Sequence, residues 1–140
     1  MKVNVEIRSV LSVLKDSEEG KLDKCAIVAF ADDEDGFVNY CHNEPVFKCV
    51  VVDETFQSLS CSYEEFFPQA KEVANFVNYY INLGYKIICQ CEYGVSRSSG
   101  CAAAIKEFYE RSGIEIFSDY RYRPNQVIYH KLMDEFEKLF

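Results

Sequence analysis

Three short segments of this chain are apolar through nearly their whole length, and they constrain the fold more than any other feature. They are CAIVAF (25–30), KCVVVD (48–53) and YKIICQC (85–91), each of strand length. A strand with one solvent-facing side alternates apolar and polar residues, so continuous runs indicate strands covered on both faces. Residues 3–7 do alternate, and they predict a fourth, short strand.

Three helices are predicted between and after these strands. Apolar side chains recur every three or four positions in residues 64–82, and Gly84 follows as a stop signal. A second helix is expected over 97–111 and a third over 125–139, which Pro124 opens. Strands that alternate with helices predict an α/β fold. We expect a mostly parallel central sheet of four to five strands, flanked by helices on both faces.

Length and charge narrow the possible partners and location. The 140 residues, 49% of them apolar, are expected to form a single domain, 1–140, around one core. The formal net charge is −8, and nucleic acid and anionic membranes are bound by basic surfaces, so neither is an expected partner. No apolar run approaches the length of a membrane span, the start lacks a secretory h-region, and the seven cysteines form no paired framework. We therefore expect a cytoplasmic protein.

The residues suited to chemistry lie in the segment 86–104. A strand ends at Cys91, the loop EYGVS follows, and Arg97 begins a helix of small residues, which gives the motif C-x5-R with Gly94 inside and Ser98 after it. A loop between a strand end and a helix N-terminus directs backbone amides inward and binds anions. An arginine fork holds two phosphoryl oxygens, and the same field favours a thiolate. The motif predicts a phosphate site with a nucleophilic sulfur.

CEYGVSRS resembles the signature loop of the cysteine-dependent tyrosine and dual-specificity protein phosphatases, and it is most similar to the small bacterial-type, dual-specificity-like members. The resemblance continues into the helix SSGCAAAI and the Pro-Asn pair of RYRPNQVIYHKLMDEFEKLF. It implies a dual-specificity phosphatase-like fold without a metal or other cofactor. The implied reaction is hydrolysis of phosphotyrosine, and also of phosphoserine or phosphothreonine, on a phosphorylated protein or a small phosphomonoester.

The resemblance also implies roles for individual residues. Cys91 would attack phosphorus and form a phosphocysteine, while Arg97 and the loop amides would hold the phosphoryl oxygens. Ser98 would assist the breakdown of this intermediate. The implied substrate-binding residues are those of the loop and its arginine: Glu92, Tyr93, Gly94, Val95, Ser96 and Arg97.

The family uses an aspartate on a separate, upstream loop to protonate the leaving oxygen and then to activate water. Asp53 is our candidate, because it ends the predicted strand 48–53 and should lie at the same sheet edge as Cys91. Its neighbour Glu54 is the rival. The acidic run Asp32–Asp35 ranks third, and we predict that it is a solvated turn.

One residue departs from the family pattern. Family members usually have histidine before the nucleophile, where it orders the loop and lowers the thiol pKa, and here the residue is Gln90. A second hypothesis is therefore a catalytically weak module that binds phosphate or a phosphopeptide. The loop also lacks the lysines typical of members that act on inositol lipids. Sulfur transfer and arsenate reduction are weaker alternatives, because the similar loops of rhodaneses typically differ in length and surroundings, and phosphatase-type arsenate reductases carry the loop near the N-terminus.

Several other residues near the motif have structural interpretations. Cys89 is predicted to be a buried strand residue. Cys101 is predicted to pack in the core, with a protective disulfide to Cys91 as the alternative. Asn125 is expected to cap or brace near the loop. Arg121 and Arg123 are either rim charges for an acidic substrate or solvated charges.

Overall fold

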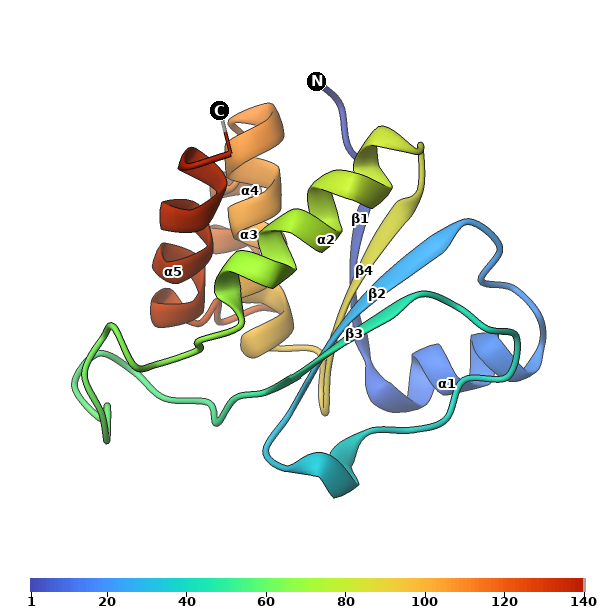
Figure 1. Ribbon diagram of the computed structural model, residues 1–140, viewed down its shortest axis with the longest axis horizontal. Helices are drawn as coiled ribbons and strands as arrows, with labels where there is room; N and C mark the ends of the chain where they lie inside the picture. The colour runs from blue at the N-terminus through green and yellow to red at the C-terminus, as the bar shows by residue number, and fades with distance from the viewer. Residues whose placement is uncertain (140) are drawn as a thin grey trace.

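The computed structural model describes residues 1–139 and contains one four-stranded sheet (Figure 1). Its strands are β1 (Val5–Ser9), β2 (Cys25–Ala31), β3 (Val46–Val50) and β4 (Lys86–Cys91). Their spatial order is β1-β4-β2-β3, and each neighbouring pair is parallel. The two central strands are buried along almost their whole length, as continuous apolar runs predict. The expected parallel α/β sheet is confirmed.

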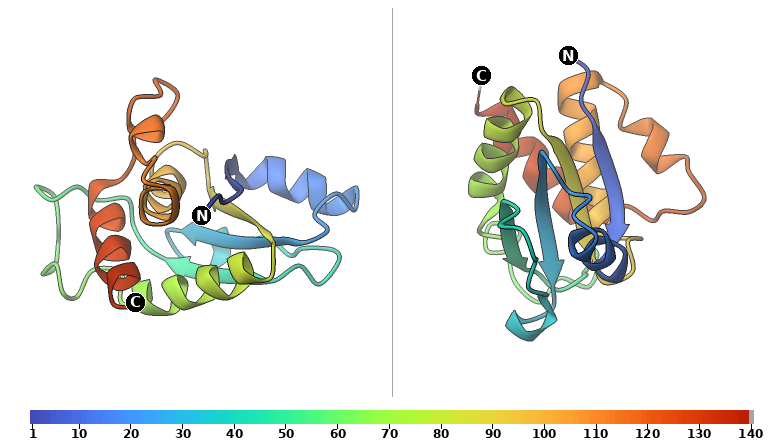
Figure 2. Two further views of the ribbon diagram at one scale, coloured as in Figure 1. Left: turned by 90° about the horizontal axis from the view of Figure 1, so that it is seen from above. Right: turned by 90° about the vertical axis from the view of Figure 1, so that its right-hand side faces the viewer.

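Helices cover both faces of this sheet, as predicted. They are α1 (Val10–Glu18), α2 (Ala70–Asn82), α3 (Arg97–Glu110), α4 (Ile114–Phe117) and α5 (Gln126–Glu137). Figure 2 shows α1 on one side of the sheet and α2 on the other. A small core beneath α1 includes Val13 and Ile88. A larger core beneath α2, α3 and α5 includes Val77, Ile105 and Phe136. No helix within residues 1–139 is long and apolar enough to cross a membrane.

Two helices differ from expectation. The helix predicted over 64–82 begins only at Ala70, because Phe67 has a positive φ of 54° and the following Pro68 disfavours helical backbone before it. Helix α1 was not predicted. The side chain of Ser9 caps its N-terminus, and Val10, Val13 and Leu14 recur at helical spacing on one face, of which only Val13 is fully buried.

The third strand was predicted to end at residue 53, but β3 ends at Val50. Val50 pairs with Ala31, the last residue of β2, and the Val51 amide donates the final bond to the Ala31 carbonyl. No partner strand continues beyond that point, so the chain leaves the sheet. Asp53 therefore lies in a loop, three residues after the strand.

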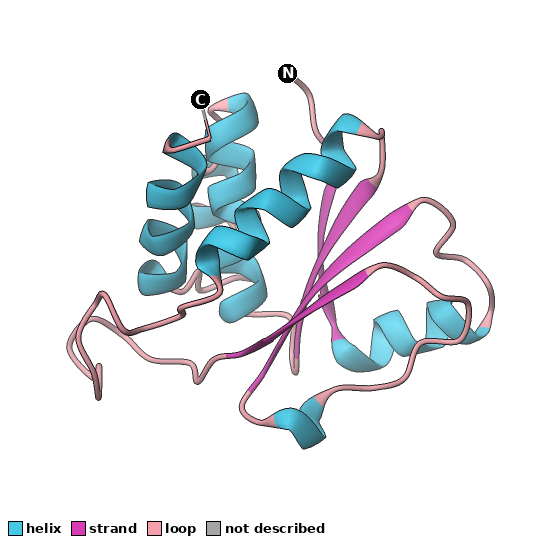
Figure 3. Cartoon of the chain, in the orientation of Figure 1, coloured by secondary structure: helices cyan, strands magenta, loops and turns pink. Residues whose placement is uncertain are grey.

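The site is positioned by the carboxyl ends of the strands. Because all four strands are parallel, their carboxyl ends lie at one edge, and Ser9 is in register with Cys91 as Ala31 is with Val50. Figure 3 shows the loops that leave these ends together. The segments 32–36, 51–55 and 92–96 therefore meet at this edge, where ligands of open α/β sheets bind.

Candidate active site

The loop 92–96 joins β4 to the N-terminus of α3 and requires glycine at its centre. Gly94 has a φ of +70°, which L side chains rarely adopt. A Cβ atom at this position would also lie 2.8 Å from the carbonyl carbon of Arg8 and 2.9 Å from the Ser9 nitrogen. Both are backbone atoms and cannot move aside. The loop conformation thus depends on this one residue.

The segment 123–125, which precedes α5, is hydrogen-bonded to the loop 92–96. The amides of Arg123 and Asn125 donate hydrogen bonds of 3.0 Å to the carbonyls of Val95 and Ser96. Helix α3 packs closely against the same segment at Gly100. A Cβ atom at this position would lie only 2.6 Å from the Asn125 carbonyl oxygen, so the close packing requires glycine. These hydrogen bonds hold the Val95 and Ser96 carbonyls toward the segment outside the loop. The amides of the loop can then face inward.

Cys91 lies at the base of the loop and is 4% exposed. Its Sγ is 3.1 Å from the Oγ of Ser98, which lies in the first turn of α3. Burial raises the pKa of the Cys91 thiol. Hydrogen bonds from the Ser98 hydroxyl and from the amides of Ser98, Val95 and Gly94 outweigh burial, so that its pKa falls below the ordinary value. The surroundings therefore favour the thiolate.

Arg97 is 7% exposed, and its guanidinium is held from one side. Nη1 donates to Oδ1 of Asp32 at 2.6 Å and to the Val51 carbonyl at 2.8 Å. Among residues 1–139, Nε and Nη2 have no such partner, so this pair of donors remains available for an anion. Asp32 was predicted to belong to a solvated turn. Its side chain is indeed 62% exposed, but the carboxylate also pairs with Arg97, which that prediction did not include.

The two carboxylates proposed as the acid point to different partners. Oδ1 of Asp53 accepts hydrogen bonds from the Ser96 hydroxyl at 2.8 Å and from the Asn125 amide group at 2.7 Å. Its Oδ2 has no hydrogen-bond partner within the described chain. Glu54 instead accepts from the amide and hydroxyl of Ser60. Asn125 both caps α5 and braces Asp53, as predicted.

A cavity of about 460 Å³ opens above the sulfur and brings most of the predicted residues together. Its lining residues are Asp53, Cys91, Tyr93, Val95, Ser96, Arg97 and Arg123. Ser98 lies behind the sulfur and is fully buried. Glu92 does not line this cavity but a neighbouring one, which it shares with Asp32 and Arg97. Gly94 contributes its amide to the sulfur rather than a cavity wall.

Gln90 faces the opposite side of the sheet from Cys91, toward the smaller core. It is 1% exposed, and its Oε1 accepts a 2.7 Å hydrogen bond from the hydroxyl of Tyr40. Burial raises the pKa of Tyr40 to about 12, so this hydroxyl remains a donor at neutral pH. Sequence reasoning missed Tyr40, because it lies in an irregular loop and no local pattern links it to Gln90.

Asp32 could have been found from the sequence. It follows the strand β2 directly, and the argument that placed Asp53 at the edge of the sheet applies to it equally. Its place in a run of four acidic residues made a solvated turn the simpler interpretation.

The thiols of Cys89 and Cys101 lie side by side in the larger core, with their Sγ atoms 3.5 Å apart. Both residues are fully buried, as predicted for core cysteines. Cys101 therefore faces Cys89 rather than Cys91, the partner considered for a disulfide.

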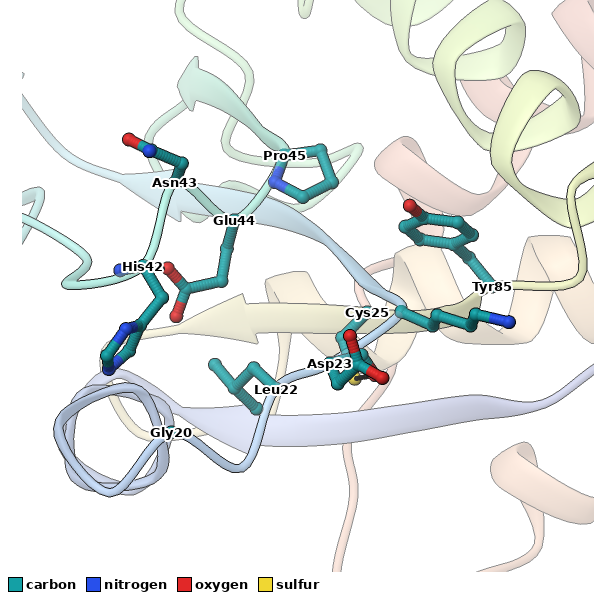
Figure 4. A pocket seen from close by; sticks show the side chains of 10 residues that line it. Gly20, Leu22, Asp23, Cys25, His42, Asn43, Glu44, Pro45 and Tyr85 are labelled. Atoms are coloured by element: carbon teal, nitrogen blue, oxygen red, sulfur yellow. Dashed lines mark hydrogen bonds between the residues drawn. The ribbon is translucent and has the colours of Figure 1, made fainter.

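A separate cavity of about 420 Å³ lies near the amino-terminal end of β2 (Figure 4). It is lined by Gly20, Leu22, Asp23, Lys24, Cys25, His42, Asn43, Glu44, Pro45 and Tyr85. None of the predicted site residues is among them. Within the described chain, no three His, Cys, Asp or Glu side chains are grouped so that they could hold a metal ion.

Comparison with models of known protein families found no match, and comparison with curated protein sequences found none. Solved structures do match. The human tyrosine phosphatase-like serine/threonine/tyrosine-interacting protein superposes with a TM-score of 0.66 at 16% identity, over 97% of this chain and 92% of its own. DUSP15 gives 0.65 at 16% identity, over 96% and 85%. PTPMT1 in complex with PI(5)P gives 0.62 at 14% identity, over 97% and 92%.

These likenesses extend over nearly the whole of each chain. The chain has the fold of the dual-specificity-type phosphatases.

Proposed function

We propose that this protein is a phosphatase that hydrolyses phosphomonoesters on proteins through a cysteinyl-phosphate intermediate. One observation carries the proposal. The Cys91 sulfur, with its lowered pKa, lies at the base of a cavity that also contains the free donors of Arg97 and the Asp53 carboxyl. A nucleophile, an anion clamp and a proton donor are the groups that phosphoryl transfer to sulfur needs.

In the first step the Cys91 thiolate attacks phosphorus. A sulfur–phosphorus bond forms as the bond between phosphorus and the leaving oxygen breaks. Nε and Nη2 of Arg97 and the inward-facing loop amides hold the phosphoryl oxygens. Protonated Asp53 donates its proton to the leaving oxygen from Oδ2, while Oδ1 stays bonded to Ser96 and Asn125.

In the second step Asp53 accepts a proton from water, and the resulting nucleophile attacks the phosphorus of the intermediate. The sulfur–phosphorus bond breaks, and inorganic phosphate is released. The departing sulfur carries the electron pair as a thiolate, which the hydroxyl of Ser98 stabilises from 3.1 Å. This step restores the starting enzyme, and no redox change occurs.

The residues around the cavity support a phosphotyrosine substrate. The side chains of Tyr93, from the loop, and of Arg123, from the segment before α5, add to the cavity wall and can pack beside an aromatic ring. PTPMT1, one of the structural neighbours, was solved in complex with PI(5)P. Here the loop carries Glu92 and no lysine, and its acidic charge opposes a polyanionic head group. Phosphoserine and phosphothreonine are the secondary substrate class.

A second candidate function is binding of phosphate or a phosphopeptide without turnover. Gln90 in place of the usual histidine favours it, and one structural neighbour is described as a phosphatase-like interacting protein. The hydrogen bonds that lower the pKa of the Cys91 thiol from its ordinary value argue for catalysis instead, because binding alone requires no nucleophile.

Release of p-nitrophenol from p-nitrophenyl phosphate separates the two functions. We expect turnover by the wild type, none by Cys91→Ser, and wild-type turnover by Cys41→Ser, which removes an exposed thiol outside the cavity. A denaturing quench during turnover should retain phosphate on Cys91. A wild type no faster than Cys91→Ser would leave only the binding function.

A further inference from the structure

The cavity above Cys91 does not end at the phosphate-binding loop. A second cavity, of about 580 Å³, adjoins it, and Asp53, Ser96 and Arg123 line both. The 2.8 Å hydrogen bond between Ser96 and Asp53 therefore forms part of the boundary between them. The shared lining residues place the second cavity next to a substrate whose phosphate lies over Cys91.

Three aromatic side chains, Phe56, Phe117 and Tyr122, form part of the wall of the second cavity. The residues beyond the shared boundary are Glu54, Thr55, Phe56, Gln57, Phe117, Tyr122, Pro124, Asn125 and Gln126. The two carboxylates in the wall already have partners, since Asp53 bonds to Ser96 and Asn125, and Glu54 to Ser60. What the cavity offers an occupant is thus mainly apolar surface.

The aromatic walls are held in place by their own packing. The Phe117 ring packs edge-to-face on Tyr129 with centroids 5.0 Å apart. Phe56 stacks on Tyr63 at 6.1 Å and contacts His130 at 5.8 Å, yet 43% of Phe56 stays exposed. Because these rings are already held in place, binding of a side chain against them carries a smaller entropic cost of ordering.

Arg123 supplies the cation at the junction of the two cavities. Its amide is fixed by the Val95 carbonyl. Within residues 1–139 its guanidinium has no carboxylate partner, whereas Arg8, Arg97 and Arg121 are each paired with one. An unpaired guanidinium beside an aromatic wall suits the carbonyl groups of a peptide backbone.

We propose that the second cavity is a specificity subsite for an apolar side chain adjacent to the phosphorylated residue of a peptide, with Arg123 donating to the peptide backbone between them. The proposal rests on the proposed phosphatase function. A second phosphate is a poor occupant, because Asp53 and Glu54 lie in the same wall as the single cation Arg123. A small phosphomonoester would not reach the second cavity, and its aromatic side chains would remain exposed to water. We therefore take the occupant to be a side chain of a peptide substrate.

The test compares three kinds of substrate: p-nitrophenyl phosphate, a phosphotyrosine peptide flanked by alanines, and the same peptide with leucine or phenylalanine before or after the phosphotyrosine. We expect the wild type to prefer one apolar peptide over the alanine peptide about tenfold or more in kcat/KM. Phe56→Ala should reduce this preference to near one and leave turnover of p-nitrophenyl phosphate unchanged, because Phe56 lies outside the phosphate cavity.

The controls separate the subsite from stability and from the proposed function. Tyr79→Ala, which removes an exposed aromatic ring on α2, should keep the preference. Phe117→Leu is the second subsite variant, because it retains packing against Tyr129, and it should weaken the preference. Thermal unfolding monitors the fold of each variant.

Two results would overturn the subsite: equal kcat/KM for all the peptides in the wild type, or a preference that survives in both Phe56→Ala and Phe117→Leu. A soluble phosphatidylinositol phosphate turned over faster than any peptide, and equally by Phe56→Ala, would also overturn it. Without p-nitrophenyl phosphate turnover the phosphatase function fails, and the subsite is then judged by the affinities of Cys91→Ser for the same peptides. The same tenfold preference in binding would support it, and equal affinities would refute it.

Discussion

Nη1 of Arg97 lies 2.6 Å from Oδ1 of Asp32, although 65 positions separate the two residues in the chain. The same Nη1 donates to the Val51 carbonyl. Two acceptors on one nitrogen fix the plane of the guanidinium, and they leave Nε and Nη2 to face a ligand. A planar fork binds an oxyanion well only when it is correctly oriented. Under the proposed function, Asp32 would therefore position the guanidinium that binds phosphate.

Replacing Asp32 by alanine tests this role. We expect kcat/KM for p-nitrophenyl phosphate to fall about five- to tenfold, a modest effect because the carboxylate is largely exposed. Inhibition by inorganic phosphate should weaken by a similar factor, since the clamp and not the nucleophile is affected. Asp35→Ala, an exposed neighbour from the same acidic run, should change neither quantity. A rise in phosphate affinity would mean that Asp32 restrains Arg97 rather than orients it.

Removal of the Ser98 hydroxyl should change the titration of Cys91. This hydroxyl lowers the pKa of the Cys91 thiol by bonding to the thiolate, so Ser98→Ala should raise that pKa. Activity requires the thiolate and is lost as the pH falls through the pKa. The acidic limb of kcat/KM should therefore move to higher pH in the variant.

Alkylation by iodoacetamide as a function of pH measures the same pKa directly. Peptide mapping must separate Cys91 from the exposed Cys41 and Cys61. Inorganic phosphate should protect Cys91 alone. An unchanged Cys91 titration in Ser98→Ala would show that the loop amides hold the thiolate without the hydroxyl.

Local patterns predicted the parts of this fold that depend on local physics. Buried strands require continuous apolar runs, and the loop requires glycine with a positive φ at Gly94, so both are legible in the sequence. Helix α1 escaped prediction although Ser9 caps it and Val10, Val13 and Leu14 recur at helical spacing, because its apolar face spans only its first five residues. The break before α2 depends on the backbone at Phe67 and Pro68, within a stretch that otherwise reads as helical.

The candidate site likewise has a part that local sequence patterns predict and a part that they do not. Its loop is one continuous segment, whereas its supports come from distant loops that only the folded sheet brings together. The bond from Arg97 to Asp32 and the bond from Tyr40 to Gln90 span 65 and 50 positions. No spacing rule links such pairs, so a single sequence points to a candidate nucleophile more readily than to the distant residues that contact its neighbours.

Tyr40→Phe should destabilise the protein through the residue before the nucleophile. The change leaves the Oε1 of buried Gln90 without its donor, which costs about 1–3 kcal/mol of the free energy of unfolding. Denaturant unfolding measures this loss. Tyr79→Phe, at an exposed tyrosine, should have little effect. An equally stable Tyr40→Phe would mean that Gln90 finds another partner and that Tyr40 does not support the strand end.

Asp53→Asn tests the assignment of the general acid without disturbing its surroundings. Asparagine keeps an Oδ1 acceptor for Ser96 and Asn125, so the boundary of the cavity should persist. It cannot supply a proton to the leaving oxygen, and general acid catalysis typically contributes about 10²- to 10⁴-fold. We therefore expect kcat/KM for phenyl phosphate, a poor leaving group, to fall at least about 100-fold.

The fall for p-nitrophenyl phosphate should be clearly smaller, because p-nitrophenolate leaves without much assistance. Glu54→Gln is the matched control, since the Glu54 carboxylate bonds to Ser60 and not to the catalytic loop. It should leave the rates for both substrates close to wild type. If Glu54→Gln instead abolished turnover of phenyl phosphate while Asp53→Asn retained it, the acid would be Glu54. The loop 51–55 would then have to turn during catalysis, because the bonds to Ser60 hold the Glu54 carboxylate away from Cys91.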